Sequence, residues 1–307
     1  MRVVPALSRN LRELRMVDEK QTRSLSKGLS LKSKLGYSMK KTATLLAALA
    51  IAMATTQAED KIVIKGSDTL GAKMVPQQAE AYKAAGNDVS FEIAAEGSST
   101  AFTNLLAGTA EIGMSSREVK SSEVDEFTAK GMELKEWVAG YDMIGVIVNE
   151  NNGVKNLTLE QIEKIFTGDI TDWSEVGGAA GEISVYTRNT SSGTYKSFQE
   201  MAMDKRDYSP SSQKMAGNEQ IAAEVAKNPN GIGYVGLAYI ENDGIKAVDV
   251  DGVECVAKNA KDYPISRSLH FFTIKGKLSP AAEKFLTWAT TDPAGTEIVE
   301  KVGFIKP

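Results

Sequence analysis

The sequence predicts an α/β protein with largely parallel sheets. Short apolar segments rich in β-branched residues alternate with amphipathic segments of helical length along most of the chain. The chain has 307 residues, of which 42% are hydrophobic and 25% charged, so it has enough apolar material for a large core. Repeated alternation of strands and helices favours helices layered against a sheet.

The expected elements follow one another in alternating order. Strands are expected at residues 61–65, 89–95, 110–116, 141–149, 182–187 and 231–240. Helices are expected in a stretch that ends near Ala85 and at residues 99–108, 123–131, 159–168, 194–203, 218–230, 279–291 and 293–303. Capping-box spacing marks the start of two of these helices, with the pairs Ser122 and Asp125, and Thr158 and Gln161.

The first 58 residues are not expected to belong to the fold. Two lysines precede an apolar stretch at about residues 45–54, and small residues lead up to Ala58. This pattern is typical of a secretory signal peptide at residues 39–58, cut after Ala58, and it indicates an exported protein. A short buried helix is the alternative interpretation of the apolar stretch. Residues 1–38 are basic and are interpreted as a mis-assigned start or an unusual leader.

Charge and composition exclude several classes of function. The first 58 residues carry 11 Lys and Arg but 3 Asp and Glu, which leaves 25 basic and 37 acidic residues and a net charge of about −12 beyond them. Such a chain is a poor candidate for binding nucleic acid or an anionic membrane. The single cysteine, Cys255, excludes an intramolecular disulfide and is expected to be buried and inert. The single histidine, His270, disfavours histidine-rich metal sites and Ser-His-Asp catalysis.

Three strand-to-helix junctions share the same chemistry, at residues 66–71, 96–101 and 187–194. In each, glycine allows a close approach of the backbone and hydroxyls add donors. The first N–H groups of the following helix have no intrahelical acceptor and lie at the positive end of its dipole. These donors suit a small tetrahedral oxyanion held without a metal. Helix capping alone is the alternative for any single junction.

Two arginines add positive charge near these junctions. Arg188 lies inside the third junction, and Arg117 follows a strand. Arginine suits forked contact with a tetrahedral anion. A surface or interdomain salt bridge is the alternative for both side chains.

The motifs GS-x-T-L, EGSS, G-x-SSR, TR-x-x-SSGT and YPISR, in this order, resemble those of the periplasmic phosphate-binding proteins of PstS type, the soluble receptors of phosphate ABC importers. The resemblance runs from about Lys61 to Pro307. It implies an α/β, two-lobed periplasmic binding protein fold with a ligand cleft between the lobes and crossing hinge segments. The lobes would be residues 59–140 plus 237–307, and residues 141–236.

The resemblance also implies a set of ligand residues. Carried over by motif, they are Ser67, Thr69, Leu70, Ser98, Ser99, Ser116, Arg117, Arg188, Ser192, Gly193 and Thr194. Better-known family members have acidic residues at the positions of Ser116 and Thr190, where they accept the proton of hydrogen phosphate. Asp142 is the candidate replacement here, and a structural carboxylate at a lobe crossing is its alternative.

The expected function is therefore a non-catalytic receptor that binds inorganic phosphate and delivers it to the permease and ATPase subunits of an ABC importer. We expect a monomer without a cofactor or metal. One alternative is the same fold binding another oxyanion, such as sulfate or molybdate, and another is a role in adhesion or sensing. A secreted serine hydrolase is disfavoured, because only His270 could serve as a histidine base and no G-x-S-x-G elbow is present.

Overall fold

The computed structural model describes residues 60–307, which all belong to one unit of the chain, Ala58–Pro307. The expected leader, residues 1–38, and the expected signal peptide, residues 39–58, lie outside the described residues. None of the helices described is both long and apolar enough to cross a membrane.

All the strands and helices predicted from the sequence are present, most of them with ends within a few residues of those expected. The strands are β1 Asp60–Gly66, β2 Val89–Ala95, β3 Ile112–Ser115, β4 Leu134–Asn149, β5 Asn156–Leu157, β6 Ser184–Arg188, β7 Gln213–Met215, β8 Gly231–Gly236, β9 Ile245–Ala247, β10 Asp249–Val250 and β11 Ser266–Ile274. The α-helices are α2 Asp68–Gly71, α3 Met74–Ala84, α4 Ser98–Ala107, α5 Ser121–Ala129, α6 Leu159–Thr167, α7 Gly193–Ala202, α8 Asn218–Lys227, α9 Pro280–Thr291 and α10 Pro293–Lys301. Three short 3₁₀ helices are η1 Trp173–Val176, η2 Leu237–Tyr239 and η3 Ala257–Asn259.

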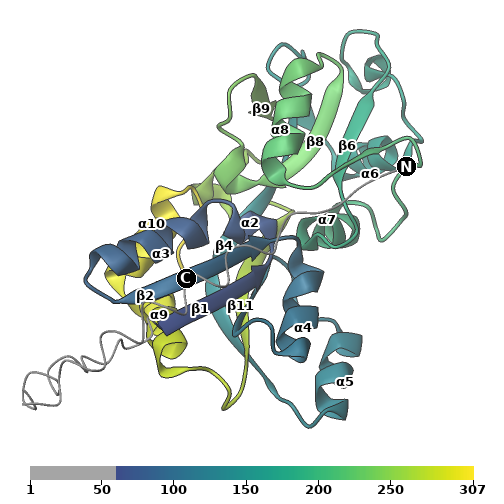
Figure 1. Cartoon of the computed structure of the whole chain (residues 1–307). Helices are drawn as coiled ribbons and strands as arrows, with labels where there is room; N and C mark the ends of the chain where they lie inside the picture. Colours follow the sequence, from purple (N-terminus) through teal and green to yellow (C-terminus); the bar gives the residue numbers. More distant parts are fainter. Residues whose placement is uncertain (1–59) are drawn as a thin grey trace, which may run out of the picture. The chain divides into compact units, whose positions relative to one another are not determined.

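The long strand β4 connects two groups of elements. The strands follow the order β2-β1-β3-β11-β4-β8-β6-β7, and β9 also pairs with β4. Residues 134–143 of β4 pair with β11, whereas residues 144–149 pair with β8 and β9. Figure 1 shows α3, α9 and α10 with the first group of strands and α6 and α8 with the second. The change of partner after Met143 agrees with a crossing segment between two α/β lobes.

The expectation of largely parallel sheets is wrong, because the pairing is mixed. β1, β2 and β3 are parallel, as are β6, β7 and β8. β11 runs antiparallel to both β3 and β4, and β8 runs antiparallel to β4. β11 was not predicted from the sequence, although it lies in the middle of the sheet. Its first three residues, Ser-Arg-Ser, are polar and only partly buried, so the segment lacks the continuous apolar pattern that indicates a buried strand.

The middle of the sheet is apolar on both faces. Val146, Ile147 and Val148 of β4 are completely buried, as are Ile232 and Val235 of β8. Continuous apolar runs of this kind are typical of strands that helices cover on both sides. The core thus fixes the carboxyl ends of the parallel strands, from which the three donor-rich junctions leave.

One of the two predicted capping boxes is confirmed. The Thr158 hydroxyl accepts from the Gln161 N–H at 3.1 Å, and the Gln161 side chain accepts from the Thr158 N–H at 2.9 Å. The prediction for Ser122 and Asp125 is wrong, because α5 begins two residues earlier than expected, at Ser121, with Lys120 as its N-cap. There Glu123 accepts from the Lys120 N–H at 2.9 Å, so a carboxylate closes the first turn of the helix.

Candidate anion-binding site

The three junctions predicted from the sequence converge in the structure. The first and third meet where the hydroxyl oxygens of Thr69 and Thr194 lie 2.9 Å apart. The second and third meet where the N–H of Ser99 donates to the Ser191 carbonyl at 3.1 Å. The first and second meet through the Gly97 N–H, which donates to the carbonyl of Gly66 at 2.7 Å. One cluster of donors therefore forms from segments far apart in the chain.

The cluster is almost closed to solvent. All the expected ligand residues except the half-buried Ser99 are buried: Ser67, Thr69, Leu70, Ser98, Ser116, Arg117, Asp142, Arg188, Ser192, Gly193 and Thr194. Two helices, α4 and α7, begin in the cluster at Ser98 and Gly193. Their N-terminal N–H groups and helix dipoles favour negative charge at this place.

Gly193 lets two of the junctions approach closely. A Cβ atom on Gly193 would lie 2.2 Å from the Ser98 Oγ and 2.7 Å from the Ser116 Oγ. No side chain fits into that space, so the start of α7 packs directly on two serine hydroxyls. Ser98 also accepts from the Ser116 N–H at 3.0 Å. Glycine at position 193 thus brings the donors of both groups of elements together.

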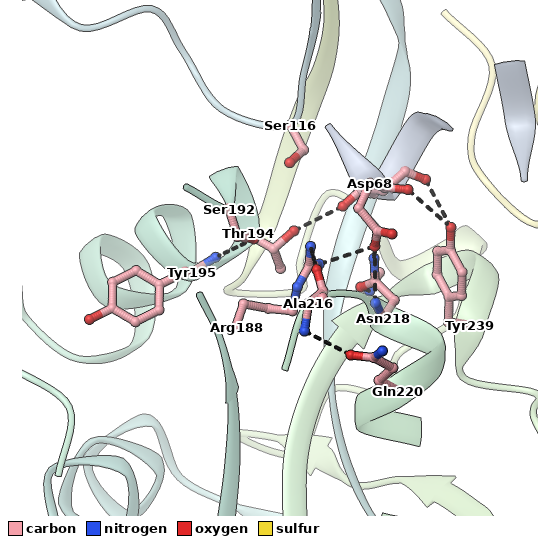
Figure 2. Close-up of polar contacts among 12 residues, drawn as sticks. Asp68, Ser116, Arg188, Ser192, Thr194, Tyr195, Ala216, Asn218, Gln220 and Tyr239 are labelled. Carbon is pink, nitrogen blue, oxygen red and sulfur yellow. Dashed lines mark hydrogen bonds and ion pairs between the residues drawn. The ribbon is translucent and has the colours of Figure 1, made fainter. Parts of the chain in front are cut away.

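Arg188 supplies a buried positive charge at the end of β6, and Figure 2 shows its guanidinium directed toward Asp68. The side chain is 1% exposed, and its Nη2 donates to the Ala216 carbonyl at 2.8 Å. Its Nη1 lies 3.3 Å from the Asp68 Oδ2. Neither Nη1 nor Nε makes a hydrogen bond within the part of the chain that the structure describes. Burial lowers the pKa of Arg188, and the nearby carboxylate of Asp68 opposes this effect.

Asp68 is a carboxylate beside Arg188 that the sequence reasoning missed. Its Oδ2 accepts from the N–H of Asn218 at 3.0 Å and from the Asn218 Nδ2 at 2.7 Å (Figure 2). The residue lies inside the GS-x-T-L motif, at the position read there as variable. A charged residue inside a donor-rich loop could have been noticed. Its partner Arg188, however, is 120 residues away in the sequence.

Arg267 is a second residue that was missed. It belongs to β11, and its Nη2 donates to the Thr194 hydroxyl at 3.0 Å. Its Nη1 donates to the carbonyl of Ser116 at 2.9 Å. The motif YPISR, which ends at Arg267, was noted for the resemblance but was given no role. This arginine joins the third junction to the loop that follows β3.

Asp142 is fully buried beside this arginine. Its Oδ2 accepts from the Nε and Nη2 of Arg267 at 3.0 and 2.6 Å, and its Oδ1 accepts from the Leu237 N–H at 2.8 Å. Asp142 therefore holds Arg267 in place and has donors on both oxygens. Direct contact between Asp142 and a ligand stays a prediction.

Arg117 lies at the edge of the cluster in a strong ion pair. Its Nη2 and Nη1 donate to the two carboxylate oxygens of Glu123 at 2.6 and 2.9 Å. The guanidinium also lies over the ring of Phe102, 5.1 Å from its centre, and Nη2 donates to the Ser99 hydroxyl at 3.3 Å. The ion pair with Glu123 agrees with the alternative interpretation of Arg117, in which it forms a salt bridge. Its role as a ligand contact stays a prediction.

Comparison of the chain with known proteins finds similarity to substrate-binding proteins. The PBP superfamily domain matches residues 52–293. The phosphate-binding protein PstS of Pseudomonas aeruginosa is 32% identical, over 78% of this chain and 81% of that protein. PstS of Bacillus subtilis is 30% identical, over 81% of each chain. A crystal structure from Clostridium perfringens, described as a putative phosphate ABC transporter substrate-binding protein with bound phosphate, is 36% identical. It aligns with a TM-score of 0.75, over 81% of this chain and 100% of that one.

Proposed function

Since the chain belongs to the PBP superfamily and, within it, to the phosphate-binding proteins of PstS type, we propose that it binds inorganic phosphate in the buried donor cluster. The bound anion then lies between the two groups of elements that β4 connects. In this role the chain is a receptor that delivers phosphate to the permease and ATPase subunits of an ABC importer.

The observation that carries this proposal is that Arg188 is buried with part of its hydrogen-bonding capacity unused. A guanidinium that is 1% exposed has two nitrogens, Nε and Nη1, that make no hydrogen bond in the described part of the chain, although Nη1 lies 3.3 Å from the Asp68 carboxylate. A buried donor without a partner costs roughly 1–3 kcal/mol, and more when it is charged. Phosphate oxygens would accept from these nitrogens, and such charge-assisted bonds contribute roughly 1.5–3 kcal/mol each.

The other donors complete a tetrahedral site. Thr69 and Leu70 of the first junction would supply a hydroxyl and an N–H group, and Ser98 the second junction's hydroxyl. Ser192, Gly193 and Thr194 would supply the third. All are buried, so a bound anion would exchange water for fixed donors. No metal or cofactor is needed for this binding.

Entry of a ligand into so buried a cluster requires the junctions to separate. We place the hinge where β4 changes partners, after Met143, and where β8 ends at Gly236. The lobes are then residues 59–140 plus 237–307, and residues 141–236. We propose one change to these bounds: Ile245–Ala247 move from the first lobe to the second, because β9 pairs with residues 147–149 of β4. Hinge closure around a ligand is a motion typical of periplasmic binding proteins.

Export to the periplasm by the signal peptide, a monomeric state and the absence of catalysis belong to the same proposal. A serine hydrolase finds no support at His270. Neither of its ring nitrogens hydrogen-bonds a serine hydroxyl, or any other group, in the described residues.

Thermal unfolding in the presence of different oxyanions tests the proposal. The full chain is purified, freed of bound anion by unfolding and refolding, and heated with phosphate, arsenate, sulfate or molybdate. We expect phosphate to raise the melting temperature in proportion to the logarithm of its excess over the dissociation constant, since it binds only the native state. A larger rise with sulfate or molybdate would identify another oxyanion as the ligand. No rise with any of the four would overturn the proposal.

A further inference from the structure

His270 occupies an unusual position outside the donor cluster. It lies in the middle of β11, opposite Ser115 of β3 and Val138 of β4, where the pairing between β11 and β4 shifts its register. Its side chain is 2% exposed. Both ring nitrogens lack a hydrogen-bond partner within residues 60–307. A buried imidazole without hydrogen bonds carries a desolvation cost that a bound ligand would reduce.

Two carboxylates face this ring. The Oε1 of Glu136 lies 2.5 Å from Nδ1, and the Oε1 of Glu118 lies 3.3 Å from Nε2. Neither contact has the geometry of a hydrogen bond. Neither carboxylate forms an ion pair with a lysine or arginine of the described residues. Two carboxylate oxygens with lone pairs thus lie beside the ring, one next to each of its nitrogens.

We propose that Glu118, Glu136 and His270 bind a divalent transition-metal ion, with Zn²⁺ as the best match. One ligand atom from each of the three residues lies within 4.8 Å of the others. Zn²⁺ binds imidazole nitrogen and carboxylate oxygen at roughly 2.0–2.2 Å, so the three atoms must move closer together. The glutamate side chains can do so by rotation, because they are 74% and 44% exposed.

The chemistry of the three residues narrows the choice of ion. Imidazole suits Zn²⁺, Cu²⁺ and Ni²⁺, whereas Mg²⁺ and Ca²⁺ prefer sites made only of oxygen. Three protein ligands leave at least one coordination position, which water would fill on the exposed side of the glutamates. The site adjoins the donor cluster, since the Arg117 Nη1 donates to the Glu118 carbonyl at 2.8 Å. Its three side chains are not among the expected anion ligands, so its proposal does not depend on phosphate binding.

The composition of the chain makes a sharp experiment possible. His270 is the only histidine in all 307 residues, and Cys255 is the only cysteine. The full chain, without a histidine tag and in buffer free of phosphate, is titrated with Zn²⁺ by calorimetry. The same titration is followed by NMR of the ring protons of histidine, which give signals from this one residue. We expect one equivalent of Zn²⁺ to saturate the heat and to shift the histidine signals.

Variants separate the proposed site from adventitious binding. The double variant Glu118→Gln and Glu136→Gln changes only exposed side chains, and we expect it to fold normally and to lose affinity for Zn²⁺ at least about tenfold. His270→Gln should lose affinity as well. Glu133→Gln, which changes an exposed glutamate paired with Lys275, is the matched control and should bind as the native chain does.

Two results would overturn the proposal. One is the absence of saturable Zn²⁺ binding, which would leave His270 as an imidazole packed between two carboxylates. The other is binding that persists unchanged in the double glutamate variant or leaves the histidine signals unmoved.

Discussion

The hydroxyl oxygens of Thr69 and Thr194 lie 2.9 Å apart, although 125 positions separate the two residues in the sequence. Thr69 follows the strand β1 of the first group of elements, and Thr194 lies in α7 of the second. Arg267 also donates to the Thr194 hydroxyl, at 3.0 Å. Donors from the two groups thus meet at one point, so an anion bound there would be held by both. Binding and closure are coupled in such an arrangement, because neither group alone has the complete set of donors.

Arg188→Ala should weaken phosphate binding at least about tenfold, because the variant removes the charged donors at the centre of the cluster. The unliganded protein should remain folded, since two of the nitrogens removed have no hydrogen bond there. Calorimetry on anion-free protein measures the affinity, and circular dichroism checks the fold.

Arg206→Ala is the matched control for this change. Arg206 is exposed and pairs with Glu163 and Asp169. Its removal should leave the affinity for phosphate unchanged. Equal affinities of the native protein and Arg188→Ala would assign Arg188 a structural role.

Gly193→Ala tests whether the junctions must approach as closely as they do. The added Cβ would lie 2.2 Å from the Ser98 Oγ, so the start of α7 must move away from α4. We expect a loss of phosphate affinity of at least about tenfold. Helix α7 should still form, because alanine has a higher helix propensity than glycine. Gly153→Ala is the control, since a Cβ at Gly153 meets no atom within 4 Å. Unchanged calorimetric affinity in Gly193→Ala would show that closure tolerates a wider spacing.

Cys255 should be almost unreactive in the native protein. It is 3% exposed, and burial raises the pKa of its thiol to about 12. A raised pKa lowers the fraction of thiolate, which is the reactive form, at every pH below it. At pH 8 a chromogenic disulfide reagent should therefore label the native chain at least ~100-fold more slowly than the chain unfolded in urea. Equal rates would show that this part of the core opens readily.

The sequence predicted most of the helices, the longer strands other than β11 and the donor-rich junctions, because each depends on residues close together in the chain. The capping box of Thr158 and Gln161 is of this kind, as is the turn from β6 into α7. The pairing of β11 depends instead on strands more than 100 residues apart, and Asp68 with Arg188 and Asp142 with Arg267 depend on the same long-range assembly. Local patterns do not show which carboxylate meets which arginine, so two residues of the candidate site were missed.

A carboxylate in the site can discriminate between phosphate and sulfate, since at neutral pH phosphate still carries a proton and sulfate does not. An ionised carboxylate accepts that proton and repels an oxyanion that has none. The sequence predicted Asp142 for this role. In the structure both oxygens of Asp142 already accept from Arg267 and Leu237, whereas the Oδ1 of Asp68 accepts no hydrogen bond from the described residues. Asp68 is also the carboxylate paired with Arg188.

We therefore expect different effects from the two variants. Asp68→Asn should relax the exclusion of sulfate, because the neutral amide no longer repels a deprotonated anion. Asp142→Asn should lower the free energy of unfolding by about 3 kcal/mol, because it leaves the buried charge of Arg267 without its partner. Competition calorimetry with phosphate and sulfate measures the first effect, and urea unfolding of the anion-free protein measures the second. If only Asp142→Asn relaxes the selectivity, Asp142 is the residue that discriminates phosphate from sulfate, as the sequence predicted. An unchanged margin between phosphate and sulfate in both variants would show that neither carboxylate discriminates, and would leave selectivity to the geometry of the donors.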